Sequence, residues 1–279
     1  MRTIDAKIIT STVKRLCIEA NCFLTDDIKN CIANAKNTET WPQAKEILGH
    51  IIENYKIAEE SNKPVCQDTG IACVFLKIGQ EVHISGDITD AINEGVRQGY
   101  NEGYLRKSVV ADPLNRVNTG DNTPAMIYFE LIPGDKIEIT VAPKGFGSEN
   151  MSRIAMLSPS DGLQGVKAFV KQTVLEAGPN PCPPIVVGVG IGGTFDKAAL
   201  LAKKALLRPI DTPNKNPFYA KLEAELLDEI NTLGIGPQGF GGKTTALKVN
   251  VEYYPTHIAG LPVAVNINCH VTRHKTEVI

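Results

Sequence analysis

The sequence lacks the features that mark several large classes of protein. No segment approaches the roughly 20 consecutive apolar residues that a membrane-spanning helix needs. The first residues, Met1-Arg2-Thr3-Ile4-Asp5, lack the apolar run and cleavage site of a secretory signal peptide. Basic residues number 29 against 31 acidic ones, so the cationic excess typical of nucleic-acid-binding proteins is absent. These absences predict a cytoplasmic protein that binds neither a membrane nor a nucleic acid.

The cysteines do not form the even-numbered, regular pattern of a secreted disulfide framework. The chain has seven of them, at positions 17, 22, 31, 66, 73, 182 and 269. Close C-x₂-C pairs, which hold zinc in small structural sites, are also missing. In a reducing compartment such cysteines are buried apolar residues, nucleophiles or metal ligands, and their surroundings must separate these roles.

The hydrophobic pattern predicts an α+β fold. At 279 residues, of which 43% are hydrophobic, the chain can bury a sizeable core. Apolar residues recur at helical spacing through the first 60 residues. Strands are predicted over residues 71–78, 125–131, 136–142, 185–189, 246–253 and 263–268, and further helices over 88–104, 161–177, 194–207 and 217–233. We therefore expect one domain over residues 1–279, with a helical N-terminal region followed by mixed β-sheets flanked by helices.

Two local signals refine this picture. Pro133-Gly134-Asp135 lies between two predicted strands and predicts a hairpin turn. A polar stretch over residues 105–124 is too long for a simple connection, and such loops in compact domains are often functional. Residues 144–150 predict a glycine-rich loop.

Two glycine-rich segments resemble nucleotide-binding motifs only superficially. Gly188–Gly193 satisfies G-x-G-x-x-G after a predicted strand, but Asp211, the acidic residue at the required distance, does not end a strand. Tight packing of a strand on a helix explains these glycines better. Gly242-Lys243-Thr244 would need a glycine where Pro237 stands, so a phosphate-binding loop is not favoured.

Three cysteines differ from the others in their surroundings. Cys66, Cys182 and Cys269 each lie in a predicted loop or at a strand end, whereas Cys73 lies within an apolar strand that predicts burial. Their wide separation suits a site assembled from distant loops. Spacing alone does not establish such a site, and three unrelated thiols remain the simpler interpretation.

Five segments occur in order along the chain: Lys63–Gly70, Asn118–Pro124, Lys144–Asn150, Pro181–Gly193 and Gly260–His270. Together they resemble the N-terminal portion of class I fumarases, and equally the alpha subunits of two-subunit fumarases and tartrate dehydratases. The resemblance runs from the helical start to Cys269. Phe146 departs from the pattern, because the family usually has a third glycine there.

The resemblance implies an iron–sulfur cofactor. In that family three cysteines bind a [4Fe–4S] cluster, and the matching positions here are Cys66, Cys182 and Cys269. Such clusters normally have four thiolate ligands. Three ligands leave one iron open, and an open iron can act as a Lewis acid on a hydroxy acid. We expect this cluster at an edge of the fold that faces a partner.

The same resemblance assigns roles to five further residues. Asp68 is implied as the acid that assists loss of hydroxide, and Gln67 as a residue that orients the substrate. Arg106 corresponds to the family's carboxylate-binding arginine, and Gly147 to a backbone N–H that contacts a carboxylate. His257 corresponds to a histidine that reaches the site from the neighbouring half of a dimer.

The family's one-chain enzymes have a second domain that completes the active site, and its residues are not present here. We therefore expect a beta subunit, activity only with that partner, and an assembly that is a dimer of heterodimers. The expected reaction interconverts malate and fumarate plus water, in the tricarboxylic acid cycle. L-tartrate dehydration to oxaloacetate is the alternative, and a zinc or mononuclear-metal enzyme and a non-catalytic Fe–S regulatory protein are rivals from other classes.

Overall fold

The computed structural model describes residues 2–279, and these divide into two compact units. The first unit contains the chain up to Thr25, Asn54–Gly145 and Arg273–Ile279. The second contains Asp26–Glu53 and Phe146–Thr272. The chain therefore passes between the units several times. Among the described helices, none is long and apolar enough to cross a membrane.

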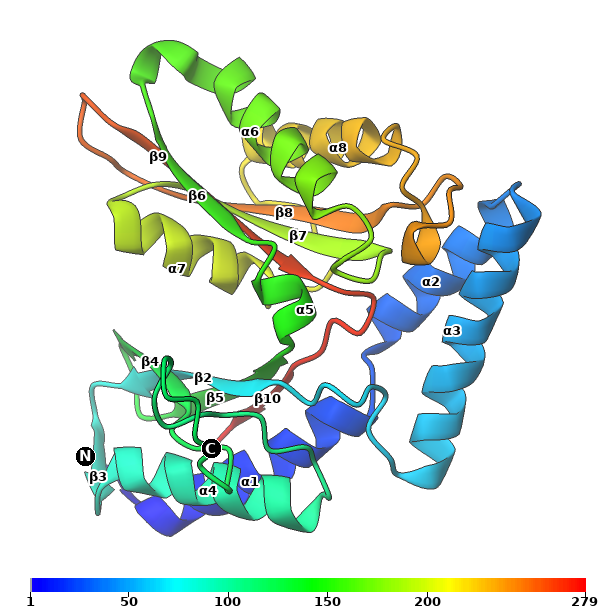
Figure 1. The fold of residues 1–279 in the computed structure, drawn as a ribbon. Helices are drawn as coiled ribbons and strands as arrows, with labels where there is room; N and C mark the ends of the chain where they lie inside the picture. The colour runs from blue at the N-terminus through cyan, green and yellow to red at the C-terminus, as the bar shows by residue number, and fades with distance from the viewer. Residues whose placement is uncertain (1) are drawn as a thin grey trace. The chain divides into compact units, whose positions relative to one another are not determined.

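The first unit is built on a four-stranded mixed sheet covered by two helices. Helix α1 (Ala6–Cys22) and helix α4 (Ile88–Glu102) lie side by side against the sheet (Figure 1). The sheet has the order β10 (Lys275–Val278), β5 (Ile137–Lys144), β2 (Ile71–Gly79), β4 (Met126–Ile132). A separate parallel pair joins β1 (Arg2–Asp5) to β3 (Val82–Ser85).

Local sequence explains how α1 forms and packs. The Asp5 side chain accepts a hydrogen bond from the Lys7 N–H and caps the first turn. Ile9 and Val13 are fully buried in the core of the first unit. Helix α4 approaches α1 closely because Gly95 has no side chain: a Cβ there would lie 2.7 Å from the Thr10 carbonyl oxygen.

The predicted hairpin between residues 125–131 and 136–142 is wrong. Strands β4 and β5 both form but lie on opposite sides of β2, which pairs parallel with β4 and antiparallel with β5. Strand β2 is buried over residues 72–76 and pairs with one strand along each of its edges. The turn at Gly134 crosses the end of β2, where the Gly79 N–H donates to the Lys136 carbonyl at 2.8 Å.

The second unit has another four-stranded mixed sheet, with helices on both faces. Its order is β6 (Arg153–Leu157), β9 (Leu261–Asn268), β7 (Ile185–Gly192), β8 (Ala246–Tyr254). Helix α7 (Phe195–Ala205) covers one face, and α6 (Gly162–Ala177) and α8 (Pro217–Asn231) cover the other (Figure 1). Mixed sheets flanked by helices confirm the predicted α+β class.

The predicted helical N-terminal region is also confirmed. After α1 come α2 (Asp26–Thr38) and α3 (Pro42–Ser61). Glu39, between α2 and α3, is 3% exposed and accepts hydrogen bonds from the Thr40 and Trp41 N–H groups. Its other oxygen accepts from the Lys243 N–H at 2.8 Å, so the Gly242-Lys243-Thr244 segment is tied to this corner.

The glycines of Gly188–Gly193 serve packing, as predicted. Gly188 and Gly190 lie within β7, directly under α7. A Cβ on Gly190 would lie 2.1 Å from the Ala198 carbonyl oxygen, and one on Gly188 2.2 Å from that of Ala202. No side chain fits in either gap, so the motif allows the helix to lie directly on the strand.

Candidate functional site

Residues 66–70, here called the Cys66 loop, connect α3 to β2 and fold back on themselves. The Asp68 N–H points at the Cys66 Sγ at 3.4 Å, and the Gly70 N–H donates to Asp68 Oδ1 at 3.0 Å. Gly70 has φ +72, and a Cβ there would lie 2.7 Å from the Lys144 backbone. The glycine is therefore required both by its conformation and by the close approach of β5.

Buried side chains fix three consecutive carbonyl groups of the Cys66 loop. Arg273 donates from Nη2 to the Asp68 carbonyl. The Tyr100 hydroxyl lies 2.7 Å from the Thr69 carbonyl oxygen and 3.0 Å from that of Gly70. Asn122 Nδ2 donates to the Gly70 carbonyl at 3.1 Å. Because these donors are buried and come from separate elements, the loop is held in one conformation.

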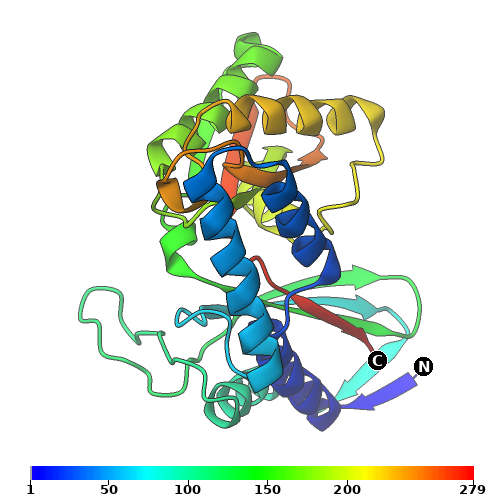
Figure 2. The ribbon, with the colours of Figure 1, turned by 90° about the vertical axis from the view of Figure 1, so that its right-hand side faces the viewer.

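Asn122 also ties the long polar loop to the Cys66 loop. Its Oδ1 accepts from the Ser108 N–H at 2.7 Å and from the Val109 N–H at 3.2 Å. The Thr69 hydroxyl donates to the Arg106 carbonyl at 2.8 Å. The backbone of Arg106 therefore lies beside the Cys66 loop, while its side chain is exposed. In Figure 2 the rest of the loop extends away from its unit.

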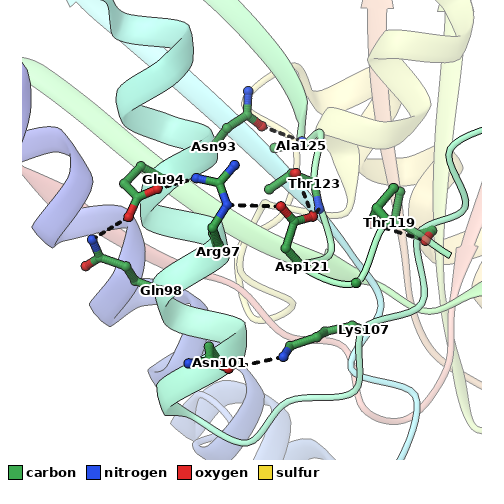
Figure 3. A network of polar contacts seen from close by, with 12 residues as sticks. Asn93, Glu94, Arg97, Gln98, Asn101, Lys107, Thr119, Asp121, Thr123 and Ala125 are labelled. Atoms are coloured by element: carbon green, nitrogen blue, oxygen red, sulfur yellow. Dashed lines mark hydrogen bonds and ion pairs between the residues drawn. The ribbon is translucent and has the colours of Figure 1, made fainter.

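The polar face of α4 binds the C-terminal end of the long polar loop (Figure 3). Arg97 pairs with Glu94 and, through Nε at 3.0 Å, with Asp121. Asp121 Oδ1 also accepts from the Thr123 N–H at 3.0 Å and from the Thr123 hydroxyl at 2.8 Å. Burial alone would raise the pKa of the Asp121 carboxyl, but these hydrogen bonds outweigh it and hold the pKa at about 2.

A cavity of about 340 Å³ opens beside this network. Lys107 lies on its wall and donates from Nζ to Asn101 Oδ1 at 3.1 Å. The lining combines cations, carboxylates and amides from α4 and the long loop: Glu94, Arg97, Gln98, Asn101, Glu102, Lys107, Gly120 and Asp121. Arg97 is paired there with two carboxylates, so the network serves to anchor the loop that carries Arg106.

In the second unit, the segments of Cys182 and Cys269 lie together. Cys182 is exposed, with a left-handed φ of +53 that is unusual for a residue with a side chain. Its carbonyl accepts from the His270 N–H at 3.3 Å, and His270 Nδ1 lies 2.9 Å from the same oxygen. Cys269 follows β9 directly and is half-buried. His270 therefore joins the two cysteine-bearing segments.

Gln238, in the glycine-rich segment 234–242, stabilises the Cys182 segment from another side. Its backbone N–H and its Nε2 both donate to the Pro183 carbonyl, each at 2.7 Å. Its φ of +54 turns both groups toward that oxygen. The glycine-rich segment therefore holds the Cys182 segment in place.

The remaining predicted residues lie elsewhere in the second unit. Gly147 is exposed and belongs to α5 (Phe146–Glu149), a single helical turn that takes the place of the predicted glycine-rich loop. Glu149 at its end pairs with Lys203 of α7 at 2.6 Å, and this pair stabilises the turn. His257 is exposed in the connection between β8 and β9, and its Nδ1 accepts from the Ala259 N–H at 3.2 Å.

The predicted residues therefore form two groups, one in each unit. Contacts in the first unit bring the Cys66 loop and Arg106 together, and contacts in the second bring the segments of Cys182 and Cys269 together. Within residues 2–279, no three His, Cys, Asp or Glu side chains are grouped so that they could hold a metal ion. Shared ligation by the three cysteines stays a prediction.

Cys73 is buried, as its apolar strand predicted. Cys22 is also buried, and burial raises the pKa of the fully buried Cys17 thiol to about 12. Burial likewise raises the pKa of the half-exposed Cys31 thiol. A thiol that resists ionisation is a poor metal ligand, because the thiolate is the binding form.

Sequence reasoning missed the residues that support the site. Tyr100, Asn122 and Arg273 fix the Cys66 loop, and Gln238 and His270 fix the Cys182 segment. Asn122 and His270 fall within motifs that carried the family resemblance, so a signal existed for them. Tyr100 and Arg273 lie outside every such motif.

Comparison with known proteins identifies the family. The family model described as fumarate hydratase (Fumerase) matches residues 10–278. A protein of Methanocaldococcus jannaschii, provisionally named L(+)-tartrate dehydratase subunit alpha, is 48% identical over 272 residues, which cover 95% of each chain. The L(+)-tartrate dehydratase subunit alpha of Escherichia coli O157:H7 is 33% identical over 275 residues, covering 97% of this chain and 90% of that protein. The chain therefore belongs to the fumarate hydratase (Fumerase) family.

Proposed function

We propose that this chain is the alpha subunit of an iron–sulfur hydro-lyase that adds water to, or removes it from, a small dicarboxylic acid. One observation carries the proposal: the chain matches, over nearly their whole length, proteins named as alpha subunits of a dehydratase. The fumarate hydratase family model, which matches residues 10–278, supports the same reaction class.

The proposed cofactor is a [4Fe–4S] cluster with Cys66, Cys182 and Cys269 as ligands. The donor set fits such a group, because these three thiols lie outside the regular elements and are not fully buried. An N–H aimed at the Cys66 Sγ suits a thiolate acceptor. When bound, the cluster supplies an open iron that acts as a Lewis acid toward the substrate hydroxyl and carboxylate.

The chain's own residues would bind the substrate and manage its protons. Asp68 is proposed to give a proton to the departing hydroxide, which is a poor leaving group without an acid. Arg106 would bind a carboxylate bidentately and stabilise the charge that develops when a carbon-bound proton is removed. Gln67 is exposed next to Asp68 and would orient the substrate.

Two residues of the second unit complete the proposed set. Gly147 would offer its backbone N–H to a carboxylate. His257 would act in an assembled dimer, since it is exposed on the connection between β8 and β9.

The proposed partner is a beta subunit that supplies the base for the carbon-bound proton. The names of the relatives support it, because an alpha subunit implies at least one other kind of subunit. A dimer of two such heterodimers is the proposed assembly.

Malate and fumarate are the proposed substrate pair, which agrees with the description of the matching family model. L(+)-tartrate is the second candidate, and it is favoured by the names of the relatives from Methanocaldococcus jannaschii and Escherichia coli. The two substrates share both carboxylates and differ by a hydroxyl group, so the proposed roles of Asp68 and Arg106 serve either reaction.

The cofactor proposal is tested by single serine variants of Cys66, Cys182 and Cys269, purified without oxygen together with the partner subunit. Each should lose most of the iron and sulfide that the wild type binds, since removing one of three ligands abolishes the site. Cys31→Ser is the matched control and should keep both. A colourless wild type that binds zinc, or ligand variants with full iron content, would refute a four-iron cluster.

A companion variant separates an enzyme from a regulatory iron–sulfur protein. Asp68→Asn should keep the iron of the wild type and lose turnover by about a hundredfold or more, because it removes the proposed acid. A wild-type complex that binds the cluster but turns over neither malate, fumarate nor tartrate would favour the regulatory alternative.

A further inference from the structure

Arg273 is a buried cation without a counter-charge. It lies just before β10 and is 5% exposed. Its Nη2 donates to the Asp68 carbonyl, but its Nε and Nη1 are buried and have no hydrogen-bond partner. Within residues 2–279 no carboxylate pairs with it. Buried guanidinium groups are normally paired, because an uncompensated charge in a protein interior is strongly unfavourable.

Arg208 in the second unit shows the ordinary arrangement. Its guanidinium pairs with the buried Glu223, and Glu252 lies 3.5 Å from its Nε. Two carboxylates thus compensate that charge. Arg273 is more deeply buried, at 5% exposed against 15% for the Arg208 side chain, and it has only a neutral carbonyl.

Hydrogen bonding alone does not explain why an arginine occupies this position. The next two carbonyls of the Cys66 loop are held by neutral donors, the Tyr100 hydroxyl and the Asn122 amide. A neutral side chain could hold the Asp68 carbonyl in the same way. The positive charge therefore needs an anionic partner that the side chains of the unit do not provide.

The field of Arg273 already reaches ionisable groups around it. Burial raises the pKa of the Cys22 thiol, and the Arg273 charge opposes that rise. Burial likewise raises the pKa of the Tyr100 hydroxyl, which the same charge again opposes. Asp68 links the guanidinium to Cys66, since its carbonyl accepts from Arg273 and its N–H points at the Cys66 Sγ.

We propose that Arg273 is a positioning residue of the active site, which fixes the Asp68 peptide and balances the negative charge of a thiolate-bound cluster at Cys66. The inference rests on the proposed function, because the cluster supplies the anion. Net charge and nearby hydrogen bonds set the reduction potential of iron–sulfur clusters. A cation at this position stabilises the reduced cluster, which is the more negatively charged form. It should also slow the loss of the cluster from the protein.

The test compares Arg273→Met, which loses charge and donor, Arg273→Gln, which keeps a neutral donor, and Arg273→Lys, which keeps the charge. In the complex with the partner, Met and Gln should shift the midpoint potential to more negative values. Both substitutions should also shorten the half-life of the cluster in the presence of an iron chelator by about tenfold or more. Arg273→Lys should restore both properties in part.

Thermal unfolding of the cluster-free full chain supplies the control. Arg273→Met should unfold at the wild-type temperature or above it, because it removes an uncompensated buried charge. Arg208→Met should unfold at a lower temperature, because it leaves Glu223 buried and unpaired.

If the wild-type complex holds its cluster, either of two results would overturn this inference and leave the proposed function intact. One is an Arg273→Met complex with unchanged potential and cluster half-life. The other is a cluster-free Arg273→Met chain destabilised as much as Arg208→Met, which would make Arg273 a structural residue only. A wild-type complex that takes up no four-iron cluster would instead refute the proposed function, and this inference with it.

Discussion

At the scale of single residues, the side-chain amide of Asn122 supplies hydrogen-bond partners to backbone groups of irregular loops, which lack the regular pairing of helices and strands. It is fully buried, with a left-handed φ of +65, and it binds the backbone of Ser108, Val109 and Gly70. Asparagine adopts this conformation more readily than most residues. The Asn118–Pro124 motif identified the segment, but no pattern could show which of its five polar side chains points inward.

Replacing Asn122 by alanine should lower the free energy of unfolding by about 2–3 kcal/mol, because two backbone N–H groups and a carbonyl lose their partner. Urea unfolding followed by circular dichroism measures the loss. Asn118→Ala is the control: its amide also binds the backbone, but it is exposed, so water replaces it and the loss should stay below about 1 kcal/mol. Equal losses in the two variants would contradict the role of Asn122.

Contacts between residues far apart in the sequence explain why the sequence identified some site residues and missed others. Cys66, Cys182 and Cys269 were singled out by their surroundings and by family motifs. Tyr100 and Arg273 bind the Cys66 loop from 31 and 205 residues away. Their types, a tyrosine in a helix and an arginine near the last strand, have common structural roles. Their contact with the Cys66 loop arises only from the fold.

At the scale of elements, periodicity predicted the long helices and the buried strands well, but not the order of strands in the sheets. The turn between β4 and β5 fits a hairpin, yet β2 takes the place between them. Strand β2 hydrogen bonds to one strand along each of its edges, and local pattern cannot reveal such pairing. Strands β6 and β10 were not predicted because they have only five and four residues.

The polar face of α4 makes the anchoring of the long loop dependent on pH. The pKa of Asp121 is held at about 2, below its ordinary value of 3.8, so its ionised form stabilises the fold. This contribution is complete above about pH 4 and is lost as the pH falls through about 2. Because the Asp121 side chain is 28% exposed, solvent screening reduces its contribution to folding stability to about 1 kcal/mol.

Asp121→Asn tests this contribution. At pH 6 the variant should be less stable than the wild type by about 1 kcal/mol, and the difference should shrink toward zero between about pH 4 and pH 2. Urea unfolding of both proteins at several pH values within this range measures it. A difference of the same size at pH 5 and pH 2 would show that the carboxylate charge does not anchor the loop.

At the scale of the whole molecule, the chain divides the proposed cluster ligands between two units. Cys66 belongs to the first unit, and Cys182 and Cys269 to the second. Each unit fixes its own cysteine segment by buried or half-buried side chains, Tyr100 and Asn122 in one and Gln238 and His270 in the other. A group that binds the folded chain and not the unfolded one stabilises the fold, so cluster binding should raise the unfolding temperature of the chain.

The net charge of −2 gives no long-range attraction for a dicarboxylate, so local cations must bind it. Arg106 is the single cation proposed for this role here, and a substrate with two carboxylates needs more. We therefore expect the cluster-loaded chain alone to be slower than the complex with its partner by at least about a hundredfold in kcat/KM. Steady-state assays with malate, fumarate and both tartrates measure it, with Arg106→Ala in the complex as the control for loss of carboxylate binding. Full activity of the lone chain would remove the need for a partner. The substrate with the highest kcat/KM in the complex would decide between the two proposed reactions.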